Sequence, residues 1–504
     1  MTRLDRRSLL KTGAAAGVLA ASGLPLGAAA RRGGVLRLGV GGARTSDSWD
    51  ARTHAGQFMI MAGHGAVFDT LTQVAASGEL VGELAERWEA SADAKLWTFT
   101  LRKGIEFHNG KLFDADDVIA SLRLHLDQTV RSPARGIVAS ISEMTAVETH
   151  KVQFRLAAPN ADFPFLLADY HLCIYPSDNL GLALAQGIGT GLYKVIGFEP
   201  GKRAMLGRVQ GHYKDGKEGW FDAVELIALN DPTTRARALM TGQVDAIDDF
   251  DLARKAELKA HKALRLSEVV GNQHLGFSMR ADQAPFHDVN LRRALKYSID
   301  RQAVVDQALF GHGRVAQDHP IGPVNQFMAM GADATAFDPD KARFYLRKAG
   351  VKQLSVTIPA EGQDHSAMGR LASAFATSAE VAGLSVANQD SHRDLTLQAS
   401  VWSGRITEDW MFTMMAGDSP WNASHWENPH FQHLLLSARA ELSTTKRQSL
   451  YKDMQTLMSD EGGALIPAFA HFADAHHDRL RHGAQVGNLY AQDSGRMIER
   501  WWFS

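Results

Sequence analysis

The chain has 504 residues, of which 45% are hydrophobic and 22% are charged, and its formal net charge is −2. This length exceeds what one hydrophobic core usually serves, so we expect two or three domains. The near balance of acidic and basic residues gives no indication of a nucleic-acid partner, and we expect none. The single cysteine, Cys173, excludes an internal disulfide and is expected to be a small buried hydrophobic residue.

Residues 1–30 have the features of an export signal rather than of a folded segment. Arg6 and Arg7 form a twin-arginine pattern, an apolar run rich in alanine and glycine follows, and residues 28–30 form a small-residue cleavage site. The match to the twin-arginine consensus is imperfect, so an ordinary Sec signal stays the alternative. No cysteine lies near the cleavage site and no later apolar run is long enough to span a membrane. We therefore expect a soluble periplasmic protein without a lipid anchor.

Alternating hydrophobicity and turn residues predict the first elements of the mature chain. Residues 34–40 alternate as a strand, and residues 96–101 do so again, with Trp97, Phe99 and Leu101 on one face. Asn-Gly at residues 109–110 predicts a hairpin turn. Asp114 is then expected to cap a helix, with Asp117 at the position of a capping box.

This region resembles a segment of the family 5 extracellular solute-binding proteins, the peptide, dipeptide and nickel receptors of ABC importers. Ala94 and Asn109 depart from the family's usual glycine and aspartate. The matching positions, at fixed spacing, are Trp88, Ser91, Asp93, Trp97, Thr98, Phe99, Leu101, Arg102, Gly104, Phe107, His108, Gly110, Asp116 and Val118.

The resemblance continues through most of the mature chain. Further stretches similar to the family are residues 189–193 (GTGLY), 235–245 (RARALMTGQVD), 285–301 and 337–350. In the third stretch, Asp288 is expected to be a helix N-cap, followed by a buried stripe of Leu291, Leu295 and Ile299.

The resemblance implies an α/β fold of two lobes, the class II, cluster C type of periplasmic binding protein, with a ligand cleft between the lobes. Lobe I is expected to comprise residues 31–270, with an extra subdomain at about 60–180. Lobe II is expected to comprise residues 271–480, and residues 481–504 to return to lobe I. The crossings between the lobes would then act as a hinge.

Residues 402–426 are unusually rich in tryptophan. The segment holds four of the chain's 10 tryptophans together with an arginine, a glutamate and two aspartates. Aromatic walls with a few placed polar groups are typical of a small-molecule site, although an aromatic core strand with its loops is the alternative.

The resemblance gives these residues specific roles. In peptide-binding relatives an acidic residue of lobe II holds the ligand's α-amino group, and Asp409 is the matching position here. Arg405 is expected to be a carboxylate partner or a structural bridge. We expect Trp402, Trp410 and Trp421 to form the walls of the cleft. Trp410 is a departure from the family pattern, because dipeptide receptors usually have proline at this position.

The implied function is capture of a peptide or peptide-like solute by hinge closure and its delivery to an inner-membrane ABC permease, by a monomer that is not an enzyme. Several alternatives stay open. The 21 histidines are compatible with a nickel or metal-chelate receptor, although none has a strong metal-ligand spacing, so we assign no metal or cofactor. Opine and glycoside ligands also fit, and a secreted enzyme is the remaining class.

Overall fold

The computed structural model describes residues 30–329, 336–359, 367–389, 397–402, 404, 406–417, 419 and 421–504. The expected signal segment, apart from residue 30, and the predicted site residue Arg405 lie outside the described residues. Within the described ranges, no helix combines the length and the apolar character that crossing a membrane requires.

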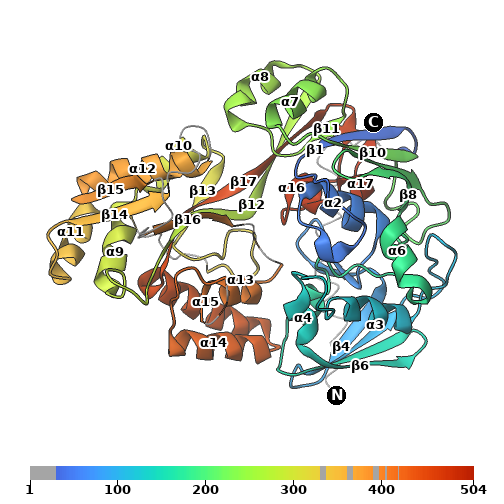
Figure 1. The fold of residues 1–504 in the computed structure, drawn as a ribbon, viewed down its shortest axis with the longest axis horizontal. Helices are drawn as coiled ribbons and strands as arrows, with labels where there is room; N and C mark the ends of the chain where they lie inside the picture. Colours follow the sequence, from blue (N-terminus) through green and yellow to red (C-terminus); the bar gives the residue numbers. More distant parts are fainter. Residues whose placement is uncertain are drawn as a thin grey trace, which may run out of the picture.

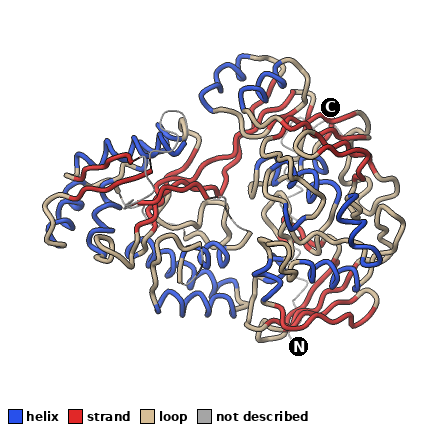
Figure 2. Tube along the Cα trace, viewed as in Figure 1, coloured by secondary structure: helices blue, strands red, loops and turns tan. Residues whose placement is uncertain are grey.

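Two bodies of mixed α/β structure lie side by side and are joined by long strands (Figures 1 and 2). We refer to the body on the right of Figure 1, which holds both described chain ends, as lobe I, and to the other as lobe II. The largest sheet has the strands β1 (Val35–Val40), β8 (Tyr193–Glu199), β9 (Arg203–Arg208), β10 (Ala223–Ala228), β11 (Ala246–Ile247), β12 (Leu264–Met279), β13 (Gly313–Val315), β16 (Leu397–Trp402) and β17 (Ala464–His477). Their order is β16-β12-β17-β11-β1-β10-β9-β8, and β13 pairs with β17.

Strands β12 and β17 pair with each other and extend from one lobe into the other (Figure 1). In lobe I β17 pairs with β11, and in lobe II β12 pairs with β16 and β17 with β13. Between the lobes, the register is interrupted between Val269 and Gln273. Gly271 lies within the interruption, where a Cβ atom would come 2.8 Å from the ring of Phe472. The sheet is therefore continuous through both lobes. It bends between them, because irregularities of this kind bend a strand.

A separate four-stranded sheet forms one end of lobe I. Its strands, in the order β4-β5-β7-β6, are β4 (Ala85–Ala90), β5 (Leu96–Leu101), β6 (Ile141–Glu148) and β7 (Lys151–Leu156), and its helices are α3 (Ala115–Leu124), α4 (Arg135–Ala139) and α5 (Phe163–Leu166). Two local predictions are confirmed here. Trp97, Phe99 and Leu101 are buried on one face of β5, and Asp114 and Asp117 form the capping box of α3.

The rest of lobe I surrounds the first strands of the large sheet. Its short strands are β2 (Thr72–Val74), β3 (Leu80–Gly82), β18 (Leu480–Arg481) and β19 (Trp502–Phe503). Its helices are η1 (Ala51–Thr53), α2 (Gln57–Ala62), η2 (Gly63–Val67), η3 (Ser177–Asn179), α6 (Leu180–Gln186), α7 (Pro232–Met240), η4 (Leu252–Arg254), α8 (Lys255–Ala260), α16 (Ala491–Ser494) and α17 (Met497–Arg500).

Lobe II packs helices against β12, β16 and a parallel pair of strands. The parallel pair is β14 (Leu354–Pro359) and β15 (Leu384–Gln389), and the helices are α9 (Val289–Ser298), α10 (Arg301–Ala308), α11 (Pro339–Lys348), α12 (Ala367–Val381), α13 (Glu408–Met415), α14 (Pro429–Ala440) and α15 (Thr444–Glu461). Asp288 caps α9 by accepting a hydrogen bond from the amide of Asn290, as predicted. Leu291, Leu295 and Ile299 are buried in the core of this lobe.

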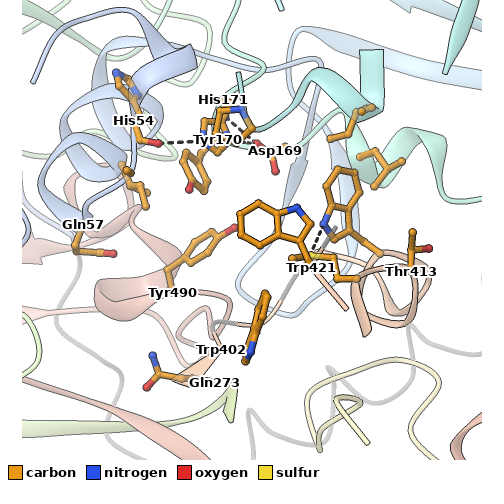
Figure 3. A pocket seen from close by; sticks show the side chains of 18 of the residues that line it. His54, Gln57, Asp169, Tyr170, His171, Gln273, Trp402, Thr413, Trp421 and Tyr490 are labelled. Atoms are coloured by element: carbon orange, nitrogen blue, oxygen red, sulfur yellow. Dashed lines mark hydrogen bonds and ion pairs between the residues drawn. The ribbon is translucent and has the colours of Figure 1, made fainter. Parts of the chain in front are cut away.

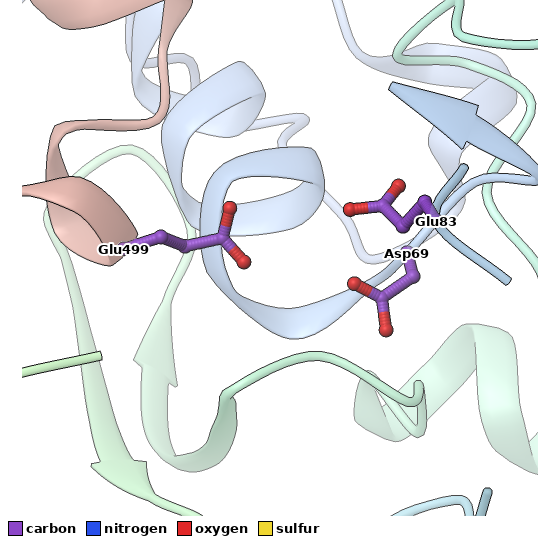
Figure 4. Close-up of side chains that lie close together, drawn as sticks. All are labelled: Asp69, Glu83 and Glu499. Carbon is purple, nitrogen blue, oxygen red and sulfur yellow. The ribbon is translucent and has the colours of Figure 1, made fainter. Parts of the chain in front are cut away.

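The C-terminal segment is attached to lobe I by a buried network of charges, three of which Figure 4 shows. Lys214 Nζ lies 2.8 Å from Asp69, 2.7 Å from Glu83 and 3.0 Å from Glu499. Arg496 pairs with Glu83 and, at 2.6 Å, with Glu499. Burial alone would lower the pKa of Lys214, but the carboxylates raise it well above its usual value. Three carboxylates within 4.8 Å of one another resemble a metal site, yet two cationic side chains already compensate them.

Removal of the central cation tests this network. We expect Lys214→Met to lower the free energy of unfolding by about 3 to 5 kcal/mol, because it leaves the buried carboxylate of Asp69 without its cationic partner. Chemical denaturation followed by tryptophan fluorescence measures the change. Lys217→Met removes an exposed lysine three residues away and should change stability by less than about 0.5 kcal/mol. Equal effects of the two substitutions would contradict the role assigned to Lys214.

Candidate functional site

A cavity of about 910 Å³ lies between the lobes, where β12 and β17 cross (Figure 3). Its volume is that of a site for a small molecule. Both lobes and the crossing strands line it, and the lining includes His54, Gln57, Asn160, Asp169, Tyr170, His171, Asp248, Asp249, Gln273, Trp402, Asp409, Trp410, Thr413, Trp421, Arg439, His471, Phe472 and Tyr490.

The three tryptophans predicted as cleft walls all line this cavity. Trp402 ends β16, and its ring meets Trp421 edge to face, with centroids 6.1 Å apart (Figure 3). Trp421 is 58% exposed, although it is a large apolar side chain. Trp410, on α13, places its indole Nε1 3.0 Å from the sulfur of Met414. The fourth tryptophan of the segment, Trp426, is buried in the core of lobe II and is absent from the described lining. Among the four tryptophans, Trp426 alone fits the alternative of an aromatic core residue.

Asp409 also lines the cavity, but its carboxylate already has a cationic partner. Arg439 Nε donates to Asp409 Oδ1 at 2.9 Å, and another nitrogen of Arg439 donates to Thr413 at 2.9 Å. Burial raises the pKa of Asp409, and Arg439 opposes that shift. A ligand ammonium at this position would therefore share the carboxylate with Arg439. The role predicted for Arg405 falls outside the described residues.

Lobe I contributes a hydrogen-bonded pair, Asp169 and His171, that the sequence did not reveal. His171 Nδ1 lies 2.6 Å from Asp169 Oδ1, and its Nε2 lies 2.9 Å from the carbonyl oxygen of His54 (Figure 3). The ring of His171 therefore bridges the side chain of Asp169 and the backbone of His54. The neighbouring ring of Tyr170 meets Tyr490 edge to face at 5.6 Å.

Two adjacent aspartates follow β11 at the same cavity. Asp248 is buried, accepts a hydrogen bond from the amide of Gly41 at 3.0 Å, and lies 3.1 Å from Arg235. Burial raises the pKa of Asp248 to about 6 despite that arginine. The next residue, Asp249, is exposed and has a left-handed φ of 36°.

The lobes also touch each other on the side of the cavity opposite the crossing strands. Asp162 of lobe I and Arg447 of lobe II form a buried ion pair. One residue earlier, the amide of Ala161 donates to the carbonyl oxygen of Arg439 at 2.8 Å. The cavity therefore lies between two groups of interlobe connections, the crossing strands on one side and these contacts on the other.

The sequence analysis identified residues of the cavity wall formed by lobe II but not those of the wall formed by lobe I. The tryptophans were recognisable because they are concentrated in one short segment. His171 and Tyr490 carry no comparable local pattern, since their partners His54 and Tyr170 lie more than a hundred residues away. An acid, an aromatic residue and a histidine in succession at 169–171 were the one available signal.

The comparisons with known proteins agree with this geometry. The family described as bacterial extracellular solute-binding proteins, family 5 Middle, matches residues 79–440, which is more than half of the chain. The dipeptide-binding protein of Escherichia coli K12 is 25% identical over 440 residues, covering 77% of this chain and 81% of the relative. The nickel-binding periplasmic protein of the same organism is 28% identical over 301 residues, covering 56% of each chain.

Solved structures support the same conclusion for the fold. The periplasmic binding protein AgaA of A. tumefaciens R10, in complex with agropinic acid, has a TM-score of 0.78 at 23% identity and covers 94% of this chain and 99% of its own. The binding protein DppA of Helicobacter pylori, in complex with the peptide STSA, has a TM-score of 0.78 at 21% identity and covers 94% and 99%. At these identities the structural likeness establishes the fold alone. With the family match, it confirms the predicted two-lobed α/β architecture: the chain belongs to the family 5 bacterial extracellular solute-binding proteins.

Proposed function

We propose that this protein captures a peptide or peptide-like small solute in the interlobe cleft and delivers it unaltered to the permease of an ABC importer. The observation that carries the proposal is the cleft, which both lobes line and into which three tryptophans and several charged pairs project. The dipeptide-binding relative and the peptide complex of the H. pylori protein support a peptide-like ligand.

Capture in this proposal is a hinge motion and involves no covalent chemistry. Lobe I comprises residues 31–270 with its subdomain at about 60–180, lobe II residues 271–480, and residues 481–504 return to lobe I. The interrupted register between Val269 and Gln273 supports a hinge at the first of these boundaries. Closure joins Asp162 to Arg447 and removes water from the ligand, which strengthens each polar contact in the cleft.

The ligand is held by aromatic walls and by its charged ends. Trp402, Trp410 and Trp421 pack on its apolar parts. Asp409 receives its ammonium group beside Arg439, and Arg405 receives its carboxylate. The protein acts as a monomer in the periplasm after export by the twin-arginine pathway, and it neither binds nucleic acid nor turns over its ligand.

A metal-chelate solute is a second candidate, because histidine side chains belong to the described cleft lining. His54 Nδ1 and His471 Nε2 are buried and have no hydrogen-bond partner in the described structure. The nickel-binding relative supports this candidate. Metal analysis of protein purified from periplasm without chelators distinguishes it from the peptide proposal.

Mass spectrometry of small molecules that co-purify from periplasm, followed by calorimetry, tests the function directly. We expect Trp421→Ala to weaken binding of the identified solute by about tenfold or more, because an exposed tryptophan of a binding cleft contributes contact area at low entropic cost. Phe344→Ala removes an aromatic side chain of lobe II that is 51% exposed and absent from the described lining, and should leave affinity unchanged. Equal losses in both variants would contradict the cleft assignment.

Two variants distinguish a contact between Asp409 and the ligand from the ion pair between Asp409 and Arg439. Asp409→Asn and Arg439→Gln both break the ion pair, but only the first removes the negative charge that would attract an ammonium group. We expect Asp409→Asn to weaken binding of a dipeptide with a free amino group by about tenfold or more. Arg439→Gln should preserve or raise that affinity. If calorimetry shows unchanged affinity for Asp409→Asn, Asp409 does not contact the ligand.

Glu408 makes stability depend on pH. It is buried and accepts a hydrogen bond from the amide of Phe327 at 3.0 Å. Burial, and then the charge of Asp162, raise its pKa from 4.5 to about 7. The folded state therefore binds a proton that the unfolded state releases between these values, so this contribution to stability falls as pH rises through about 7.

Glu408→Gln should accordingly be more stable than the native protein at pH 8, by on the order of 2 kcal/mol, and the difference should vanish towards pH 5. Denaturant unfolding at several pH values measures it. Glu427→Gln, at an exposed glutamate of the same lobe, provides the control. A difference that does not depend on pH would refute the assignment.

A further inference from the structure

The carboxylates that line the described cleft each have a side-chain partner, with one exception. Asp409 pairs with Arg439, Asp248 with Arg235, and Asp169 with the ring of His171. Asp249 is the remaining carboxylate of the described lining. Its side chain accepts no hydrogen bond and forms no ion pair with any described residue. The described wall of the cleft therefore carries one carboxylate that has neither a hydrogen bond nor an ion pair, and it lies on lobe I.

The backbone around Asp249 is fixed even though its carboxylate is not engaged. Its amide lies 3.4 Å from Asp474 Oδ1, and its carbonyl oxygen accepts a hydrogen bond from Arg235 at 2.9 Å. Asp474 also accepts a hydrogen bond from the amide of Gln492 at 2.6 Å. These bonds hold Asp249 next to the segment that contributes Tyr490 to the cleft lining.

The surroundings of Asp249 differ from those of a surface carboxylate. The side chain is accessible from the cleft, but the surrounding protein raises its pKa, and Arg235 opposes that shift. A charge in such a place is costly when water is withdrawn unless it gains a partner. The aromatic rings of Tyr170 and Tyr490 line the same cavity, and such rings favour a cation at their faces.

We propose that Asp249 binds a positively charged group of the ligand, in addition to the ammonium group assigned to Asp409. The ligand is then a peptide-like solute that carries a further amine or guanidine and has a net positive charge. This inference rests on the proposed function, because it assumes that a peptide-like solute occupies the cleft. It assigns the selection of that solute to lobe I, on the wall opposite the tryptophan-rich segment.

A pair of probes that differ in one charge tests the assignment. Ala-Lys and Ala-norleucine share the peptide backbone and the four-carbon side chain, but only the first carries the additional ammonium group. By calorimetry we expect the native protein to bind Ala-Lys about tenfold or more tightly than Ala-norleucine. Asp249→Asn should reduce this preference to about twofold or less by weakening binding of Ala-Lys alone.

The chain offers suitable variants for this experiment. Asparagine and glycine both tolerate the left-handed conformation of residue 249, so Asp249→Asn and Asp249→Gly are expected to fold as the native protein does. Asp251→Asn removes the same charge from an exposed residue two positions away that is absent from the described lining. It should retain the preference for Ala-Lys.

The outcomes separate this inference from the function on which it rests. Equal binding of the two dipeptides by the native protein overturns the role of Asp249 and leaves the peptide proposal standing. An undiminished preference in Asp249→Asn and Asp249→Gly does the same. Binding of neither dipeptide overturns the proposal that the cleft takes peptides, and this inference with it.

Discussion

The pairing of β12 with β17 is the constraint on which the arrangement of the molecule depends. A strand that leaves one lobe for the other must keep its backbone groups hydrogen-bonded, and here each crossing strand satisfies the other. Because the ladder continues into the sheets of both lobes, the lobes cannot separate, but the irregular register between Val269 and Gln273 permits a change of angle. Gln273 and Phe472, beside that irregularity, line the cleft, so the position of the binding cavity follows from the position of the bend.

Charge compensation is the second constraint, and it acts at several buried sites in the part of the chain that the structure describes. Lys214 and Arg496 compensate three carboxylates in lobe I, and Arg447 compensates Asp162 where the lobes meet. Interactions of this kind contribute less to stability than their number implies, because each charge loses its hydration on burial. Their effect is to specify geometry: an ion pair between lobes is satisfied in one relative position and lost in others. The Asp162–Arg447 pair therefore favours the relative position of the lobes seen in this structure without defining what the cleft contains.

The sequence was informative where the relevant contacts are local. Asp114 and Asp117 are three residues apart, and the alternation of residues 96–101 fixes which face of β5 is buried, so both could be predicted. The tryptophans of the cleft were predictable because one segment carries them. By contrast, the partner of Asp409 lies on the next helix, and sequence alone gives an acidic residue but not its compensation by Arg439. The wall formed by lobe I depends on contacts between residues such as His54 and His171, whose proximity only the folded chain establishes.

This difference bears on how the cleft selects its ligand. Groups that are already paired, such as Asp409 with Arg439, add little discrimination, because a ligand must compete with an existing partner for each contact. A group that has no partner discriminates more strongly, since a ligand that fails to compensate it leaves a charge without hydration after closure. The apolar walls accept many solutes of suitable size, because aromatic contact area depends weakly on chemical identity. In such a cleft, one wall selects ligands by their net charge, and the tryptophans of the other wall accept apolar groups of varied shape. A single cleft would then bind a class of related cationic solutes and reject neutral compounds of the same shape.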